Sequence, residues 1–142
     1  GSKMIPYGRQ YIDKGDIESV LEVLQSHLIT QGPKVEEFEK ALARYCDAQH
    51  AVAFNSGTSA LYCVYRALGL GQGDEFITTP ITFTATVSAG VLLGAKPVFC
   101  DVEPDTGNMD VSLLSDLITP KTKLLVPVHY AGHPVNMEEL YV

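Results

Sequence analysis

Long apolar runs are missing from this sequence. No stretch reaches the roughly 18 residues that a membrane-spanning helix needs. Residues 1–10 lack the apolar core of a secretory signal peptide, so none is predicted. Residues 1–3, Gly-Ser-Lys ahead of Met4, look like the remnant of an expression tag and are not expected to belong to the fold. Internal repeats and low-complexity segments are also absent, and the 46% hydrophobic composition is typical of a globular protein with a core.

Basic residues and cysteines are both scarce. Asp and Glu number 17 against 10 Lys and Arg, which gives a net charge of -7. This charge argues against non-specific binding to nucleic acid or anionic membranes, although one local site could still hold a small phosphorylated ligand. The odd count and long spacing of Cys46, Cys63 and Cys100 favour reduced thiols in a cytosolic protein over disulfides or zinc. We expect each to be a small buried hydrophobic side chain.

The spacing of apolar residues predicts an α/β fold. Two N-terminal helices come first, and short apolar strands then alternate with helices, which is typical of a mostly parallel sheet with helices on both faces. The expected helices cover residues 13–26, 33–47, 57–68, 83–93 and 111–118, with a last one from about 135, and the expected strands cover 51–54, 75–79, 97–100 and 123–128. Residues 4–48 would form a helical segment and 49–142 the α/β part.

Ligands of such sheets bind beyond the carboxyl ends of the strands. The loop 55–59 leads straight into a helix, whose first N–H groups are unpaired. Gly57 would allow close approach, and Thr58 and Ser59 add hydroxyls, so the loop could hold one phosphate. The alternative is an ordinary helix start capped by Ser56. Neither a Walker loop nor a G-x-G-x-x-G dinucleotide motif is present.

Two further loops leave the strand ends. Phe83 could lie flat on a planar ring ligand, or it could be a core residue. His129 could contact a cofactor or substrate, or make a structural hydrogen bond. Metal binding by His129 and His133 is disfavoured, because Gly132 and Pro134 oppose the helix that this spacing requires.

The segment from Asp101 to Gly107 has the spacing of a calcium-binding loop at first sight. Ser112 stands where the bidentate glutamate would be, and Pro104 also breaks the pattern. A solvated turn is therefore predicted.

Together these loops match one known family. The chain resembles the DegT family of pyridoxal-phosphate (PLP) sugar aminotransferases, and within it the enzymes that act on UDP-4-keto-6-deoxy sugars in pseudaminic acid biosynthesis. The stretches that carry the resemblance are MIPYGRQYID, LITQGPKVEEFE, FNSGTSAL, ITTPITFTATVSAG, GAKPVFCDVEPDTGNMD and TPKTKLLVPVHYAG.

The resemblance implies a fold and a set of roles. The fold would be an incomplete fold-type-I aminotransferase large domain. Gly57, Thr58 and Ser59 would hold the PLP phosphate, and Phe83 would stack on the pyridine ring. The sugar-nucleotide site would be lined by Tyr7, His27, Leu28, Ile29, Thr30 and Ser56. The substrates implied are glutamate and a UDP-sugar, and the assembly implied is a homodimer in the cytoplasm.

The family's Schiff-base lysine is not identified here. Lys96, Lys121 and Lys123 do not lie in the family's lysine motif and are expected to be surface charges. The aspartate that pairs with the pyridine nitrogen is expected beyond Val142 as well. We therefore expect the 142 residues alone to be inactive and to bind PLP weakly or not at all. We also expect strand 51–54 to have an unpaired edge, compensated by self-association or altered pairing.

Two other functions stay open at the level of sequence. Some members of the family are sugar dehydratases that carry histidine in place of the lysine, at a position outside these residues. A non-catalytic module that binds nucleotide sugars is the other alternative. A plain dinucleotide-binding domain is disfavoured, because no glycine-rich fingerprint follows the first expected strand.

Overall fold

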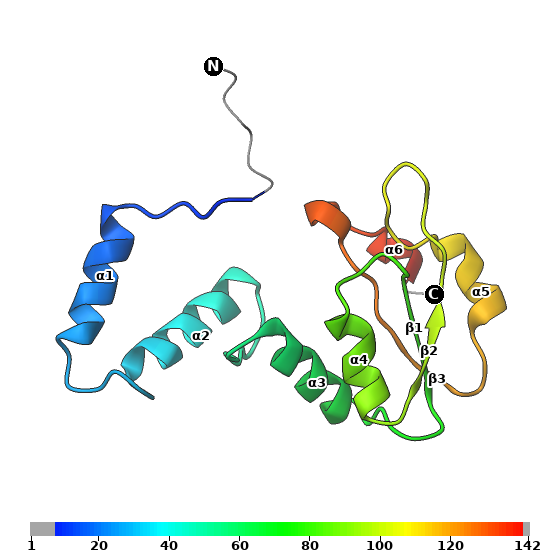
Figure 1. Cartoon of the computed structure of the whole chain (residues 1–142), viewed down its shortest axis with the longest axis horizontal. Coiled ribbons are helices and arrows are strands. Elements are labelled where there is room, and N and C mark those ends of the chain that lie inside the picture. The colour runs from blue at the N-terminus through cyan, green and yellow to red at the C-terminus, as the bar shows by residue number, and fades with distance from the viewer. Residues whose placement is uncertain (1–7, 141–142) are drawn as a thin grey trace, which may run out of the picture. The chain divides into compact units, whose positions relative to one another are not determined.

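The computed structural model describes residues 8–140 and divides the chain into two compact units, one up to Ala53 and one from Phe54. The first unit consists of helices α1 (Lys14–Leu24) and α2 (Pro33–Tyr45) with the turn between them (Figure 1). Asp13 caps α1, since its side chain accepts the N–H of Asp16 while the Asp16 carboxylate accepts the N–H of Asp13. Pro33 opens α2 at a position where its missing N–H costs nothing.

The second unit contains the α/β part. Helix α3 (Gly57–Ala67) ends before Gly69, whose φ of +78° suits glycine. The remaining elements are β1 (Glu75–Thr78), α4 (Ala85–Leu92), β2 (Lys96–Phe99), the 3₁₀ turn η1 (Val111–Leu113), α5 (Leu114–Leu117), β3 (Thr122–Leu125), the 3₁₀ turn η2 (Tyr130–Gly132) and α6 (Met137–Leu140). The expected order of strands and helices after residue 70 is thus confirmed.

The three strands form one parallel sheet in the order β2-β1-β3. Phe76 of β1 lies opposite Pro97 of β2 and Leu124 of β3. Because strand side chains alternate, Phe76 and Ile77 point to opposite faces. These two residues are fully buried and belong to separate core clusters.

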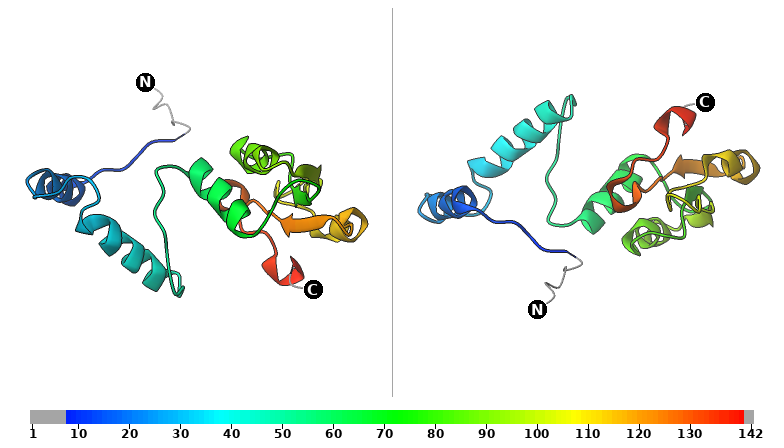
Figure 2. Two further views of the ribbon diagram at one scale, coloured as in Figure 1. Left: turned by 90° about the horizontal axis from the view of Figure 1, so that it is seen from below. Right: turned by 90° about the horizontal axis from the view of Figure 1, so that it is seen from above.

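Helices cover both faces of this sheet. Phe76 packs with Tyr65 of α3 and Ala89 of α4 on one face, and Ile77 packs with residues next to and within α5 on the other. Figure 2 shows α4 and α6 on opposite sides of the strands. The prediction of a parallel sheet covered on both faces is therefore confirmed.

The expected strand at residues 51–54 is wrong. These residues form no strand pairing, and the N–H of Ala53 donates instead to the Glu39 carboxylate at 2.8 Å. Val52 and Phe54 are exposed. A short apolar run becomes a strand only where a neighbouring strand accepts its hydrogen bonds, and residues 8–140 offer it none. The altered pairing that we expected as compensation is likewise not seen.

The expectation for the cysteines holds for one of three. Cys100 is buried next to the sheet, whereas Cys46 and Cys63 are exposed. Cys46 directly follows α2 as its C-cap, and Cys63 lies on a solvent-facing side of α3. Within residues 8–140, no helix is both long enough and apolar enough to cross a bilayer.

Candidate cofactor and nucleotide-sugar site

Ser56 caps helix α3. Its Oγ accepts the N–H of Ser59 at 3.1 Å, and the Ser59 hydroxyl donates to Oδ1 of Asn55 at 2.8 Å. The cap therefore occupies both donors of Ser59. This is the ordinary capped start that the sequence allowed as the alternative to a phosphate loop, and Asn55 is a partner that the sequence reasoning missed.

The same cap leaves other donors unused. The N–H groups of Gly57 and Thr58 have no acceptor among the described residues, and neither has the Thr58 hydroxyl. A Cβ built on Gly57 would meet nothing within 4 Å, so the space above this backbone is open. Two amides and a hydroxyl at the positive end of an 11-residue helix fit the terminal phosphate of a cofactor.

Phe83 stands between β1 and α4. The residue is 77% exposed, so it is not the core residue that the sequence offered as an alternative. The loop that carries it is braced: the Thr79 hydroxyl donates to the Ile81 carbonyl at 3.1 Å, and the hydroxyls of Thr82 and Thr86 lie 2.8 Å apart. An exposed aromatic ring on a braced loop is available to stack on a flat ligand.

Helices α3 and α4 connect the two features. They pack against each other, and the Tyr65 hydroxyl of α3 donates to the carbonyl of Thr86 in α4 at 3.0 Å. Burial raises the pKa of this Tyr65 hydroxyl, so it stays protonated as the donor. The loop that begins α3 and the loop that leads to α4 thus belong to one packed unit.

The side chain of Asn108, which is buried, bonds to the loop after β3, and sequence reasoning missed this residue. The side-chain amide of Asn108 donates to the carbonyls of His133 and Pro134 at 3.0 and 3.2 Å, and its Oδ1 accepts the N–H of Tyr130 at 2.9 Å. His129 makes the structural hydrogen bond that was one of its two expected roles: its Nδ1 accepts the N–H of Val135 at 3.0 Å. The hydrogen of a neutral imidazole is then on Nε2.

The segment from Asp101 to Gly107 forms the predicted turn. The N–H of Gly107 donates to the Glu103 carbonyl at 2.9 Å, and Gly107 adopts a φ of +70°. Val102 and Met109 pair across the turn in an antiparallel bridge.

The predicted sugar-nucleotide residues fall in three places. Ser56 lies in the α3 cap, and Tyr7 lies outside the described residues. The four residues His27–Thr30 form the turn between α1 and α2, in the unit that ends at Ala53, and all four are exposed.

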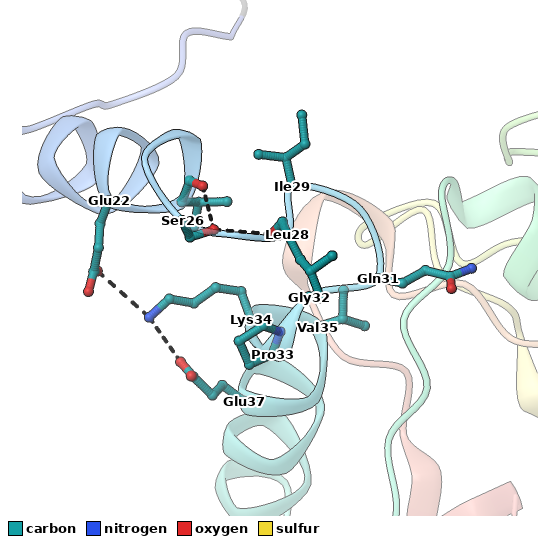
Figure 3. Close-up of a pocket in the computed structure, with 11 residues that line it drawn as sticks. Glu22, Ser26, Leu28, Ile29, Gln31, Gly32, Pro33, Lys34, Val35 and Glu37 are labelled. Atoms are coloured by element: carbon teal, nitrogen blue, oxygen red, sulfur yellow. Dashed lines mark hydrogen bonds and ion pairs between the residues drawn. The ribbon is translucent and has the colours of Figure 1, made fainter.

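A cavity of about 270 Å³ lies at this turn (Figure 3). Leu28 and Ile29 of the predicted segment line it, together with Glu22, Val23, Ser26, Gln31, Gly32, Pro33, Lys34, Val35 and Glu37. Lys34 braces one side, since its Nζ lies 3.0 Å from Glu37 and 3.8 Å from Glu22. The hydrogen bond to Glu37 and the charge of Glu22 raise the pKa of Lys34. Several cavities are lined wholly by residues 9–51, and Gly57, Thr58, Ser59 and Phe83 line none of these.

Comparison with known proteins gives the class of protein. The DegT/DnrJ/EryC1/StrS aminotransferase family matches residues 10–141, and the chain belongs to this family. It is 46% identical over 140 residues to a UDP-4-amino-4-deoxy-L-arabinose–oxoglutarate aminotransferase of Shewanella sediminis, covering 99% of this chain and 36% of that protein.

Solved structures agree with this assignment. The PLP form of Spr1654 from Streptococcus pneumoniae superimposes with a TM-score of 0.91 at 39% identity, over 96% of this chain and 35% of that one. Helicobacter pylori PseC, an aminotransferase involved in pseudaminic acid biosynthesis, gives a TM-score of 0.90 at 41% identity. The match covers 96% of this chain and 37% of PseC. The three-stranded sheet and its helices therefore match part of a fold-type-I aminotransferase. The chain spans about a third of the length of these relatives.

Proposed function

We propose that these residues are the N-terminal part of a PLP-dependent aminotransferase that moves an amino group from glutamate to C4 of a UDP-linked 4-keto-6-deoxy sugar, as in pseudaminic acid biosynthesis. The observation that carries the proposal is the start of α3, where the amides of Gly57 and Thr58 and the Thr58 hydroxyl have no partner among residues 8–140 and a Cβ atom on Gly57 would meet open space. It occurs in a chain whose residues 10–141 match an aminotransferase family.

The residues have distinct roles in this proposal. Gly57, Thr58 and Ser59 hold the phosphate of PLP, and Phe83 lies on its ring. Ser59 would exchange its cap bonds for the phosphate, because Ser56 and Asn55 occupy its donors here. PLP, when bound, supplies the electron-withdrawing ring that makes amino transfer possible. Residues 49–142 would be part of the PLP-binding large domain, and residues 4–48 a helical segment before it.

Two relatives support the proposed sugar and the proposed amino donor. The Shewanella relative is named for a UDP-sugar and for oxoglutarate, which is the keto acid left when glutamate loses its amino group. PseC supports the pseudaminic sugar in particular. Tyr7, His27, Leu28, Ile29, Thr30 and Ser56 would line the site for the UDP-sugar.

A homodimer is part of the proposal. Seven large apolar side chains of α1 and α2 are exposed by 41–62%, namely Ile17, Val20, Leu21, Leu24, Val35, Phe38 and Leu42, and Ala43 is the only buried residue in either helix. Two amphipathic helices without a core of their own need cover from other protein surface. Light scattering of the complete enzyme would show a dimer, and a strictly monomeric species would count against this part.

The test uses the complete enzyme that the proposal implies. Glutamate alone should convert bound PLP to its pyridoxamine form, seen as a change in the visible absorption band, and the keto sugar should then reverse that change. Thr58→Ala should weaken PLP binding about tenfold, which corresponds to about 1.4 kcal/mol for one charge-assisted hydrogen bond, while Thr58→Ser should restore it. Binding of a UDP-sugar without any binding of PLP would instead favour a nucleotide-sugar module.

The 142 residues alone provide a second test. Mixed with PLP and glutamate, they should form no coloured adduct and no pyridoxamine product, because none of their lysines lies in the family's lysine motif. Amino transfer by these residues alone would contradict this part of the proposal.

A further inference from the structure

The hydroxyl of Ser26 connects the end of α1 to the turn between α1 and α2. Oγ of Ser26 lies 2.7 Å from the carbonyl oxygen of Val23, at the end of α1, and 3.1 Å from the carbonyl oxygen of Leu28, within the turn, so that its single hydrogen is shared between the two acceptors (Figure 3). This side chain therefore joins the last turn of the helix to the segment that follows it. The same Leu28 carbonyl also lies against Gly32.

Gly32 permits this close approach. A Cβ atom built on Gly32 would lie 2.8 Å from the Leu28 carbonyl oxygen and 3.6 Å from the Leu28 Cβ. The φ of Gly32 is -79°, which any residue can adopt, so the restriction is one of space. Any side chain here has to displace the backbone of Leu28, because a carbonyl cannot rotate away as a flexible side chain can. The preceding residue, Gln31, has a φ of +52°, so the turn is already strained.

The cavity at the turn depends on the same contacts. Its volume of about 270 Å³ lies just below the 300–1,000 Å³ typical of complete ligand sites, so it fits one part of a larger ligand. Leu28 and Ile29 form part of its wall, and Figure 3 shows Gln31 pointing away from the Lys34 ion pairs on the other side. Moving the Leu28 backbone would change the shape of this wall.

We propose that Ser26 and Gly32 are positioning residues for the nucleotide sugar: they hold the Leu28–Thr30 backbone in the conformation that binds it. The inference rests on the proposed function, which assigns His27–Thr30 to that ligand, and neither Ser26 nor Gly32 is in that assignment. Both residues act through Leu28. The proposed function assigns only the nucleotide sugar to this turn, so we expect their effect on the sugar half of the reaction and none on the glutamate half.

The experiment separates the two halves of the reaction in the complete enzyme. Gly32→Ala should raise KM for the keto sugar nucleotide about tenfold and weaken binding of UDP-N-acetylglucosamine by a similar factor in calorimetric titration. Ser26→Ala should raise KM about threefold, and Ser26→Thr, which keeps the hydroxyl, should restore it. The rate at which glutamate converts bound PLP should stay within twofold of the parent in every variant.

Matched controls make the outcome decisive. Gly71→Ala makes the same change where a Cβ meets nothing within 4 Å, and Ser19→Ala removes a similar hydroxyl bond, to the Gly15 carbonyl, on α1. Both should leave KM unchanged. An unchanged KM in Gly32→Ala and Ser26→Ala, or a glutamate rate that falls together with sugar binding, would overturn the inference. A parent enzyme that does not react with glutamate overturns the proposed function itself, and the inference with it.

Discussion

The ring of Phe76 lies directly against the backbone of Gly90, so that a Cβ atom on Gly90 would lie 2.5 Å from Cζ of the ring. Phe76 is fully buried on the central strand β1, and Gly90 is buried on α4. The absence of a side chain at Gly90 lets α4 approach the sheet closely. This contact therefore sets the position of the helix that follows the Phe83 loop.

Gly90→Ala should destabilise the protein by about 2 kcal/mol. Overpacking of a full core costs about 1–3 kcal/mol, and a contact this short belongs at the upper end, while the better helix propensity of alanine returns up to about 1 kcal/mol. Urea unfolding followed by circular dichroism measures the difference. Gly71→Ala, where the added methyl meets open space, is the control and should change the free energy of unfolding little. Equal stability of the two variants would contradict the packing argument.

The order of elements could be predicted from the sequence because it depends on local signals. Apolar spacing acts within a few residues, and it placed the helices and the three strands of the sheet. The Asp13 cap and the glycine after α3 are local features of the same kind. Local sequence could not show that residues 51–54 form no strand, because a strand needs a neighbouring strand from elsewhere in the chain to pair with. The Phe76–Gly90 contact is also non-local and carries no sequence signal.

In the candidate site too, local features could be predicted from the sequence and contacts between distant residues could not. The residues at the start of α3 were found because helix starts have a recognisable composition, but the sequence could not tell that Ser56 and Asn55 occupy the donors of Ser59. Asn108 was missed altogether. An isolated asparagine in a turn gives no sign that it reaches residues more than 20 positions away.

Asn108→Ala should loosen the loop after β3 and cost about 2–3 kcal/mol. The change leaves the N–H of Tyr130 and the carbonyl of His133 without their partner, and buried polar groups without partners cost about 1–3 kcal/mol each, less where water can reach them. Asn108→Asp should cost at least as much, because a carboxylate would face two carbonyl oxygens.

Hydrogen exchange can locate this effect. The amides of Tyr130 and Val135 should exchange faster in both Asn108 variants, whereas amides in α3 should change only with global stability. Asn136→Ala is the matched control, since this exposed asparagine bonds only to Glu139 among the described residues. Unchanged protection at Tyr130 in Asn108→Ala would show that the side chain does not hold the loop.

Only two of the three cysteines should react with a thiol reagent in the native protein. Cys46 and Cys63 are exposed, whereas Cys100 is fully buried and its thiol donates to the Asp110 carbonyl. Burial and the nearby carboxylates of Asp110 and Asp101 raise the pKa of the Cys100 thiol, which lowers its thiolate fraction further. Labelling with a chromogenic disulfide should give two fast equivalents per chain and a third after denaturation. Cys63→Ser should reduce the fast phase to one, and a third fast equivalent in the native protein would show that Cys100 is accessible.

Part of the loss of stability in acid should come from Glu75, at the start of β1. The Thr119 hydroxyl donates to its carboxylate at 2.8 Å and the Lys96 ammonium lies 3.3 Å away, and these two partners lower the pKa of Glu75 from its ordinary value of 4.5. The unfolded chain therefore takes up a proton at higher pH than the folded protein does. The stabilisation is complete above about pH 4.5 and is lost as the pH falls through the lowered folded pKa.

Glu75→Gln tests this prediction. Urea midpoints measured from pH 7 to pH 3 should fall less steeply below pH 4.5 in the variant than in the parent, because the variant has no proton to take up at this position. Thr119→Val should reduce the acid sensitivity in part, since it removes the largest cause of the shift and leaves Lys96 in place. Glu138→Gln, a change on exposed α6, is the control and should follow the parent. Parallel curves for the parent and Glu75→Gln would mean that the hydrogen bond from Thr119 does not favour the charged form in solution.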